Sequence, residues 1–231
     1  MFWKKARKNY SNVTTDDNDI QKYFEVMNQI QSDGYNGIMG YIQDFGHKYV
    51  QNNINKNEKV LEIGFGKGRS SKYFKWEKKD YYPSELNEKY VTPQIWNSYK
   101  NATLADATNL PFEDNYFDKV VTIYNLEHIE DTDKVLAELK RVLKKDGEVL
   151  IALPCEDGFL WNMGRELTTR RIFTKKYKIN YDKVIAYEHV HNLEFLRRKI
   201  RESYFICEEK YYPFFIPSIN MNLIYTCKCK I

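Results

Sequence analysis

The stretch from Val60 to Ser70, which reads VLEIGFGKGRS, constrains the fold of this chain more than any other. A short apolar run with Glu62 inside it meets three glycines at alternate positions, and residues that can begin a helix follow. Glycine is needed where the backbone takes a positive φ or lies against a ligand, and the first turn of a helix presents unpaired N–H groups. The stretch therefore predicts a strand, a tight turn and a helix start, with a polar ligand bound over the turn.

The spacing of the glycines helps to select the ligand. A dinucleotide fingerprint, G-x-G-x-x-G, carries its third glycine where this chain has Arg69. The observed acid followed by G-x-G-x-G instead resembles the first motif of the class I S-adenosylmethionine-dependent methyltransferases, whose glycine turn passes under the methionine part of the cofactor. The resemblance implies that the cofactor contacts Glu62, Gly64, Phe65, Gly66 and Gly68. A glycine turn without a ligand is the alternative for this motif taken alone.

The size and composition of the chain fit one folded domain. Its 231 residues are enough for a sizeable core, and 42% hydrophobic with 29% charged residues is ordinary for a globular protein. The net charge of +4 is too small to indicate a nucleic-acid partner. No apolar run reaches membrane-spanning length, and the basic start, Met1 to Lys8, lacks the apolar region of a signal peptide. Since the four cysteines also lack C-x-x-C spacing, we expect a cytoplasmic protein with free thiols and without stable membrane insertion.

Two helices are predicted ahead of the glycine turn. Apolar residues keep helical spacing from Ile20 to Ile30 and again from about Gly37 to Val50. In the family that the chain resembles, such helices cap the cofactor pocket and help to form the substrate entrance, whereas the alternative is that they only cover one face of the sheet. We expect a single methyltransferase domain over residues 1–231, with a helical cap (1–55), a cofactor-binding core (56–154), a substrate-side insertion (155–190) and a closing helix with a hairpin (191–231).

Two acids after the glycine turn are candidates for the rest of the cofactor. Ser70 to Trp76 is predicted to form a short helix, and Glu85 follows at the end of a second strand, where a carboxylate can accept both hydroxyls of a ribose. An exposed surface acid is the alternative. Pro83 cannot donate to a sheet ladder, so this strand must be short or end there. The resemblance places Asp106 at the adenine edge. It also implies cofactor contacts from Leu86, Ala107 and Tyr124.

The most specific phrase in the chain is L-P-F-x-D-x-x-F-D, from Leu110 to Asp118. It leads into the run from Lys119 to Tyr124, whose β-branched residues suit a strand that is covered on both faces. The remaining predicted elements are a helix from Asp131 to Leu143, a strand from Glu148 to Pro154, a helix from Leu193 to about Ser203, and strands near Phe205–Tyr212 and Asn220–Cys229. The resemblance implies an α/β fold, a Rossmann-like three-layer sandwich. Its sheet has seven strands, six parallel and one antiparallel in the closing hairpin, with N-terminal helices and an insertion after strand five.

The chain has an insertion between Cys155 and about Glu188, at a point where the core of the family that it resembles needs only a short connection. Its run from Thr168 to Lys178 has no acid, so it could clamp a phosphate, because arginine offers a planar bidentate fork and lysine a point charge. A solvated basic face is the alternative. The candidate substrate-binding residues are Arg170, Arg171 and Tyr177.

Histidine is the candidate catalytic residue. Methyl transfer from a sulfonium is an in-line displacement, for which the enzyme aligns the two reactants and removes water. A hydroxyl acceptor would also profit from a base matched to neutral pH. The four histidines are His189, preferred because Glu188 could orient it, then His128 and His191, with His47 as the remaining one. Structural roles are the alternative for each, and no ligand spacing indicates a metal.

The acceptor is predicted by analogy alone. The insertion followed by Glu188-His189-Val190, and the segment from Tyr211 to Pro217, look similar to small methyltransferases of bacterial surface-polysaccharide pathways. This resemblance implies O-methylation of a sugar or a phosphate- or nucleotide-linked glycan precursor, with S-adenosylhomocysteine as product. C- or N-methylation of a quinone or another small molecule is the alternative, and a non-catalytic S-adenosylmethionine-binding protein is the rival from another class. The chain lacks the Asn/Asp-Pro-Pro-aromatic phrase of base-methylating enzymes after strand four, which disfavours nucleic acid, and the oligomeric state is left open.

Overall fold

The computed structural model describes residues 13–32, 38–73 and 80–231 of the chain. The basic segment from Met1 to Lys8 and the second half of the helix predicted from Ser70 to Trp76 lie outside these residues. The first half of that helix is a single 3-10 turn, η1 (Arg69–Lys72). The glycine turn, the insertion and the closing hairpin are all described.

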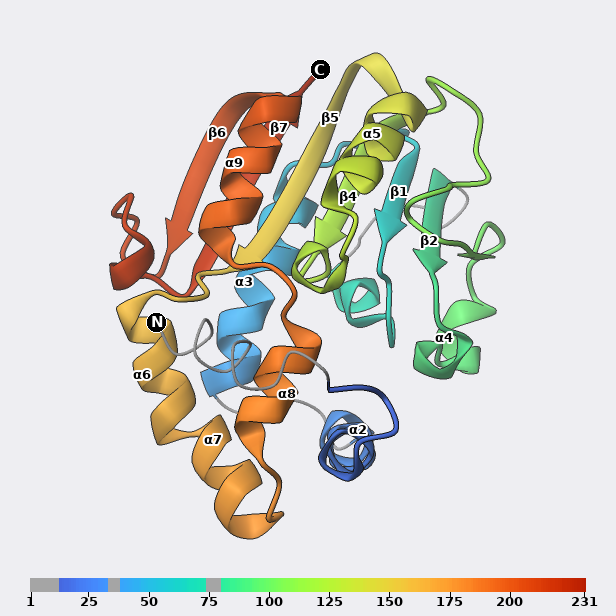
Figure 1. Ribbon diagram of the computed structural model, residues 1–231. Coiled ribbons are helices and arrows are strands. Elements are labelled where there is room, and N and C mark those ends of the chain that lie inside the picture. Colours follow the sequence, from blue (N-terminus) through green and yellow to red (C-terminus); the bar gives the residue numbers. More distant parts are fainter. Residues whose placement is uncertain (1–12, 33–37, 74–79) are drawn as a thin grey trace.

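A seven-stranded sheet runs through the middle of the molecule (Figure 1), in the order β3-β2-β1-β4-β5-β7-β6. The strands are β1 (Val60–Ile63), β2 (Tyr81–Glu85), β3 (Thr103–Leu104), β4 (Phe117–Ile123), β5 (Leu143–Pro154), β6 (Phe205–Tyr212) and β7 (Ile224–Lys230). Strands β1 to β5 pair in parallel, while β7 pairs antiparallel with both β5 and β6, so that β6 has the direction of the first five strands. The predicted sheet, six strands parallel and one antiparallel, is confirmed.

Helices cover both faces of this sheet and its carboxyl edge (Figure 1). The longer helices are α2 (Asn18–Ser32), α3 (Ile38–Asn52), α5 (Thr132–Val142), α6 (Phe159–Leu167), α8 (Tyr181–Glu188) and α9 (Leu193–Ser203). The short helical segments are α4 (Pro93–Trp96), α7 (Thr169–Arg171), the 3-10 turns η3 (Glu88–Tyr90), η4 (Leu126–His128) and η6 (Ile219–Met221), and a π turn, η5 (Ile172–Lys176). Helices α5 and α9 lie on one face and α3 on the other, while α2, α6, α7 and α8 lie beyond the carboxyl ends of the parallel strands.

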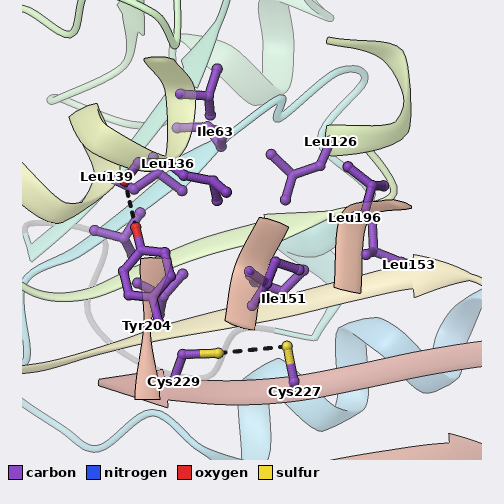
Figure 2. Packing of buried hydrophobic residues seen from close by; sticks show 14 of the residues in the cluster. Ile63, Leu126, Leu136, Leu139, Ile151, Leu153, Leu196, Tyr204, Cys227 and Cys229 are labelled. Atoms are coloured by element: carbon purple, nitrogen blue, oxygen red, sulfur yellow. Dashed lines mark hydrogen bonds between the residues drawn. The ribbon is translucent and has the colours of Figure 1, made fainter. Parts of the chain in front are cut away.

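Two buried clusters hold the layers together, one on each face of the sheet. Val120 of β4 packs in the cluster under α5 and α9, whereas its neighbour Val121 packs in the cluster under α3. Neighbouring residues of a strand point to opposite faces, so an uninterrupted apolar run fills both clusters. Figure 2 shows the first cluster, in which Tyr204 donates a hydrogen bond of 2.6 Å to the carbonyl of Leu136.

The stability of the fold is expected to depend on Leu139, which is fully buried in that first cluster. We expect Leu139→Ala to lower the free energy of unfolding by about 3 kcal/mol, because removing the side chain leaves a cavity among close-packed neighbours. Leu167 gives a matched control, since it is also a helical leucine but 54% exposed, and its change to alanine is expected to cost less than ~0.5 kcal/mol. Urea unfolding of both variants checks the prediction, and equal losses would contradict the assignment of this core.

Strand β2 is short, as predicted, but it continues two residues past Pro83 to Glu85. The carbonyl of Ser84 accepts a hydrogen bond from the N–H of Phe65, so the backbone polar groups of Ser84 point toward β1. Those of the preceding residue, Pro83, point away from β1, toward the side of β3. On that side β3 has only two residues, and its pairing begins opposite Ser84. Pro83 therefore interrupts no hydrogen bond of the ladder, and the strand can bring Glu85 to the carboxyl edge of the sheet.

Strand β5 begins at Leu143, directly after α5, and not at Glu148, where the sequence predicted its start. Leu143 pairs with Phe117, and the next registered pair is Lys119 with Glu148, so the ladder is irregular between these two pairs. Leu143 is buried, and a buried apolar side chain fits the last turn of a helix as well as the first residue of a strand. The apolar periodicity therefore does not show where the helix ends and the strand begins.

Candidate active site

The three glycines of the turn after β1 all have positive φ, at 71° for Gly64, 54° for Gly66 and 76° for Gly68. A Cβ atom at Gly64 would lie 2.2 Å from the side chain of Asn125, whereas a Cβ atom at Gly66 would have no atom of the described residues within 4 Å. Gly64 therefore serves close packing, and Gly66 faces open space. A ligand can approach the backbone at Gly66, as the sequence predicted for the cofactor.

Glu85 lies next to this open space. Its Oε2 atom accepts a hydrogen bond of 2.9 Å from the N–H of Gly66, and its Oε1 atom accepts one of 3.0 Å from the N–H of Asn87. Each carboxylate oxygen has a second lone pair, so Glu85 can still accept from the hydroxyls of a ribose. Leu86, which follows it, is 68% exposed.

Asp106 lies in the turn after β3 and is exposed. Its Oδ1 atom accepts two hydrogen bonds of 2.8 Å from Thr108, one from the N–H group and one from the hydroxyl. These bonds lower the pKa of Asp106 below its ordinary value. The carboxylate is thus held as an acceptor, which is what an adenine amino group requires, while Ala107 packs against the buried cluster under α5.

Glu62 is buried beneath the glycine turn. Its Oε1 atom accepts a hydrogen bond of 2.5 Å from Ser70, and its Oε2 atom has no partner among the described residues. Burial raises the pKa of Glu62 to about 8, although the bond from Ser70 opposes this shift. His47 lies 3.2 Å from the same hydroxyl, and burial lowers the pKa of His47 to about 3. His47 is therefore a neutral, structural histidine.

These residues fit S-adenosylmethionine. The open space at Gly66, the acceptor capacity of Glu85 and the unpartnered oxygen of Glu62 offer a cradle with carboxylates for a ligand that carries an amino group, hydroxyls and a positive charge. The individual contacts remain predictions.

Helix α3 is held over the glycine turn by polar contacts. Tyr124, at the end of β4, donates a 3.0 Å hydrogen bond to the carbonyl of Gln43 and accepts one of 3.2 Å from the N–H of Gly46. Arg69 donates to the carbonyl of Gly40 and to Asp44, at 3.0 and 2.6 Å. The hydroxyl of Tyr124 is thus engaged with α3, and the role of this helix as a cap of the cofactor pocket remains a prediction.

Two of the candidate histidines meet at the carboxyl edge of the sheet. The rings of His128, which follows β4, and His189, which follows the insertion, have centroids 5.1 Å apart. Nδ1 of His128 lies 2.6 Å from the carbonyl oxygen of Glu188, and the N–H of Val190 donates to the carbonyl of Glu127 at 2.9 Å. The end of the insertion is therefore joined to the end of β4.

Glu156 is the carboxylate that pairs with His189. It is buried two residues after β5, and its Oε2 atom lies 3.1 Å from Nδ1 of His189. Its Oε1 atom forms an ion pair with Arg165 and accepts a 3.1 Å hydrogen bond from the indole of Trp161. Burial alone would raise the pKa of Glu156, but the charges of His189 and Arg165 outweigh it and hold this pKa at about 2. Burial alone would likewise lower the pKa of His189, but Glu156 outweighs it, so that pKa is raised.

Glu188, the expected orienting group, has another partner. Its carboxylate accepts a hydrogen bond of 2.6 Å from the hydroxyl of Tyr23 on α2. The expectation that Glu188 orients His189 is therefore replaced by the pair with Glu156.

The ring of His191 contacts other residues than the rings of His128 and His189 do. Its ring stacks on Phe195 with centroids 4.2 Å apart, and its Nε2 atom lies 3.0 Å from the carbonyl oxygen of Glu130. These contacts give it a place at the start of α9, and a catalytic role for it remains a prediction.

The candidate substrate residues lie further along the insertion. Arg170 donates to Glu166 at 2.6 Å and to Asp182 at 2.7 Å, so two carboxylates already balance its charge. Tyr177 packs against Phe173 with centroids 5.8 Å apart, and Arg171 is exposed. The run from Thr168 to Lys178 contains no acid, but neighbouring segments supply acids to Arg170. Anion binding by these three residues remains a prediction.

Four residues of this region were not predicted as site residues from the sequence. They are Tyr90, Glu127, Glu156 and Arg165. Burial first, and then the charges of Glu188, Tyr187 and Glu85, raise the pKa of Tyr90 to about 12. Burial also raises the pKa of Glu127. The available signal for Glu127 and Glu156 was their position just after strands four and five, because ligands bind beyond the carboxyl ends of such strands. Within the described ranges, no group of three or more His, Cys, Asp or Glu residues is arranged to hold a metal ion.

The sheet order, the glycine turn and the acids at the carboxyl edge define the fold of the class I methyltransferases. Residues 61–151 match the family model described as "Methyltransferase domain". The chain is also similar to a solved structure from Thermotoga maritima, titled an S-adenosylmethionine-dependent methyltransferase and possible histamine N-methyltransferase. The TM-score is 0.58 at 18% identity, over 91% of this chain and 98% of that one. The predicted Rossmann-like fold is confirmed, and the match over residues 61–151 supports the predicted class, an S-adenosylmethionine-dependent methyltransferase domain.

The chain matches only part of the length of its curated relatives. The chain is 28% identical over 140 residues to the ubiquinone/menaquinone biosynthesis C-methyltransferase UbiE of Cupriavidus metallidurans, which covers 57% of this chain and 56% of that protein. It is 34% identical over 118 residues to the sterol 4-C-methyltransferase strm-1 of Caenorhabditis elegans, which covers 51% of this chain and 28% of that protein. The chain thus spans little more than half the length of the UbiE relative.

Among the described residues, no helix has both the length and the apolar character needed to cross a membrane. The cytoplasmic location stays a prediction.

Proposed function

We propose that the chain transfers a methyl group from S-adenosylmethionine to a small molecule that binds against His128 and His189. This proposal rests on the pair between Glu156 and His189, because it joins a buried carboxylate to a histidine at the carboxyl edge of the sheet. A carboxylate that holds an imidazole and stabilises its charged form is a recurrent arrangement for a general base.

The residues of the chain supply acid–base chemistry and a water-poor site, and the bound cofactor supplies the methyl group of its sulfonium. Neutral His189 accepts the proton of an acceptor hydroxyl, and Glu156 stabilises the imidazolium that forms. The resulting oxygen anion would be the nucleophile toward the sulfonium methyl group, and the thioether of the cofactor would be the leaving group. In a hydroxylated ring the neighbouring carbon would be the nucleophile instead, and this carbon would then release its own proton while the oxygen recovers the first proton from His189. In both cases one proton leaves the acceptor for each methyl group received.

A hydroxylated aromatic ring of the quinone-precursor type is the acceptor that we favour. The relatives reported above support it, since one is named for ubiquinone and menaquinone biosynthesis and another for C-methylation of a sterol. Neither is named for polysaccharide biosynthesis. The aromatic content of 16% offers material for an apolar acceptor site.

A sugar or phosphate-linked acceptor is the second candidate. The cations of the run from Thr168 to Lys178 favour it, because they include Arg171, Lys175 and Lys176 without an acid in the run. The contacts of Arg170 with Glu166 and Asp182 weaken it.

We assign the segments of the chain to the parts of this reaction. Residues 13–32 and 38–55 of the cap close the cofactor side, residues 56–154 hold the cofactor, residues 155–190 present His189 to the acceptor, and residues 191–231 complete the sheet.

Methyl transfer from isotopically labelled S-adenosylmethionine tests the proposed function. We expect label in a demethylated quinol and none in a nucleotide-linked sugar, because the acceptor site is proposed to be apolar. Label in the sugar alone would favour the second candidate. Calorimetric binding of the cofactor without label in any acceptor of either class would favour a non-catalytic binding protein.

A further inference from the structure

Helix α6 exposes an apolar stripe to solvent. Phe159, Met163 and Leu167 are 66%, 43% and 54% exposed, and their spacing of four residues puts them on one side of the helix. Single exposed apolar residues are normal at a protein surface, but a row along a helix indicates an interaction surface.

The connection between β6 and β7 exposes a second set of apolar side chains. Phe214, Phe215 and Ile216 are consecutive and are 54%, 63% and 47% exposed, and Met221 is 45% exposed. Asn222, which is fully buried, fixes the shape of this loop. Its side-chain amide donates to the carbonyls of Ile216 and Ser218 at 2.7 and 2.8 Å, and its carbonyl accepts from the N–H of Phe214 at 3.0 Å.

Phe215 is held in a conformation that aromatic residues rarely adopt. Its φ is 60°, which costs an L-residue about 1–2 kcal/mol. A loop built with such strain and with a buried asparagine is a formed structure, so the exposure of its apolar side chains is a property of the fold.

The stripe and the loop are parts of one surface. The N–H of Phe159 donates a hydrogen bond of 3.2 Å to the side chain of Asn220, and a Cβ atom at Gly158 would lie 2.2 Å from the carbonyl oxygen of Ile219. Figure 1 shows the loop, in red, beside the beginning of α6. We call the combined surface the apolar face. Its members are Phe159, Met163, Leu167, Phe214, Phe215, Ile216 and Met221.

A basic segment follows the apolar stripe of α6 along the chain. After α6 the chain runs through α7 and η5 with Arg171, Lys175, Lys176 and Lys178 exposed, and it contains no acid between Thr168 and Lys178. Ile172 lies among these cations and is 47% exposed. Apolar and aromatic side chains next to a row of cations are the composition of a surface that rests on an anionic bilayer.

We propose that the apolar face and the basic segment dock the protein on the surface of an anionic lipid bilayer. The apolar side chains enter the boundary between headgroups and acyl chains, and the four exposed cations are attracted by the anionic headgroups. A second copy of the chain would complement the apolar face but would gain nothing from four like charges. An anionic bilayer complements both the apolar face and the four exposed cations, so we favour it over a second copy of the chain.

The position of this surface relates it to the acceptor side of the candidate site. Helix α6 begins three residues after Glu156, and its residues Trp161 and Arg165 contact that carboxylate. Docking through the exposed side of α6 would therefore bring the acceptor side near the lipid. The docking itself does not depend on the identity of the acceptor.

Co-sedimentation of the full chain with vesicles tests the proposal. We expect binding to phosphatidylcholine vesicles that contain phosphatidylserine and much weaker binding to phosphatidylcholine alone. Lys175→Glu/Lys176→Glu should lower binding to the anionic vesicles at least ~10-fold, since each cation contributes about fivefold near such a surface. Phe214→Ser/Phe215→Ser should lower binding by ~10-fold or more, because two apolar side chains leave the bilayer boundary.

Matched variants control for charge and for exposed aromatic area. Phe205→Ser removes a phenylalanine that is 71% exposed at the other end of β6, and Lys140→Glu/Lys145→Glu makes the same charge change at two exposed lysines of α5 and β5. Both should bind vesicles like the original chain. The proposal would be overturned if the control variants lost as much binding, or if the chain bound uncharged vesicles equally well. It would also be overturned if the chain did not bind vesicles and instead formed a dimer in solution that Phe214→Ser/Phe215→Ser dissociates and the control variants do not.

Discussion

Replacing His189 with asparagine is expected to lower the single-turnover rate of methyl transfer by ~10²–10⁴-fold, because asparagine cannot accept the proton of the acceptor. Asparagine keeps a polar group near Glu156, so cofactor affinity should stay within about twofold of the original value. His128→Asn should lower the rate less, since the ring of His128 contacts His189, but its Nε2 atom lies 3.9 Å from the buried carboxylate of Glu127, beyond hydrogen-bond distance. Rapid-quench measurement with saturating cofactor checks both variants.

His191→Asn is the matched control for this experiment. His191 contacts Phe195 and the carbonyl of Glu130, and none of its contacts involves the pair formed by His189 and Glu156. The control should therefore retain its rate. Undiminished rates for all three variants would remove the general-base hypothesis, and a loss in His191→Asn alone would move the base to that residue.

The pH dependence of the same reaction follows from the direction of the pKa shift. Glu156 outweighs burial and raises the pKa of His189, and a base must be neutral to act. The rate should therefore increase with pH through a value above ~6.5, the ordinary pKa of histidine. Because this pKa is raised in the folded state, the stability that the pair contributes is fully present below the unfolded pKa. It is lost as the pH rises through the folded pKa.

Removing the carboxylate should move this profile. A double change, Glu156→Gln with Arg165→Met, removes both charges of the buried ion pair and so avoids leaving Arg165 buried without a partner. Burial then acts on His189 without an opposing carboxylate, and the increase in rate should shift to lower pH while the maximal rate falls. An unchanged profile would show that His189 is not the group that titrates.

The geometry of the glycine turn and the position of Glu85 could be predicted because their signals are local in the sequence. Gly64, Gly66 and Gly68 lie within five residues, and each has the positive φ that the spacing indicated. Glu85 follows within one strand–turn–helix unit, and the ladder places it beside Gly66. Patterns of this kind depend on backbone geometry, which a short stretch of sequence determines.

The contacts of His189 and Arg170 could not be predicted because they are side-chain pairs across the insertion. Glu156 joins Arg165, nine residues on, and His189, thirty-three residues on, and no periodicity specifies such pairs. The same cause explains Arg170, whose own run has no acid while Glu166 and Asp182 fold against it. Sequence charge alone therefore overestimated the positive charge available there.

Replacing Gly66 with valine is expected to weaken binding of S-adenosylmethionine at least ~100-fold. The φ of 54° is unfavourable for a β-branched residue, and the new side chain would enter the open space beside Glu85. Calorimetry with the cofactor and with S-adenosylhomocysteine measures the effect, and both ligands should lose affinity together because they share every part except the methyl group. Unchanged affinity would show that the glycine turn is not the cofactor site.

Two further variants separate occupied space from backbone strain. Gly164 on α6 also has no atom within 4 Å of its Cβ position, so Gly164→Val adds the same side chain elsewhere and should leave cofactor affinity unchanged. Gly66→Ala has a similar cost of positive φ but adds only one carbon atom. If strain alone reduced affinity, alanine and valine would weaken binding alike. If the cofactor fills the space at Gly66, valine must weaken binding several-fold more than alanine, because its additional atoms compete with the ligand for the same volume.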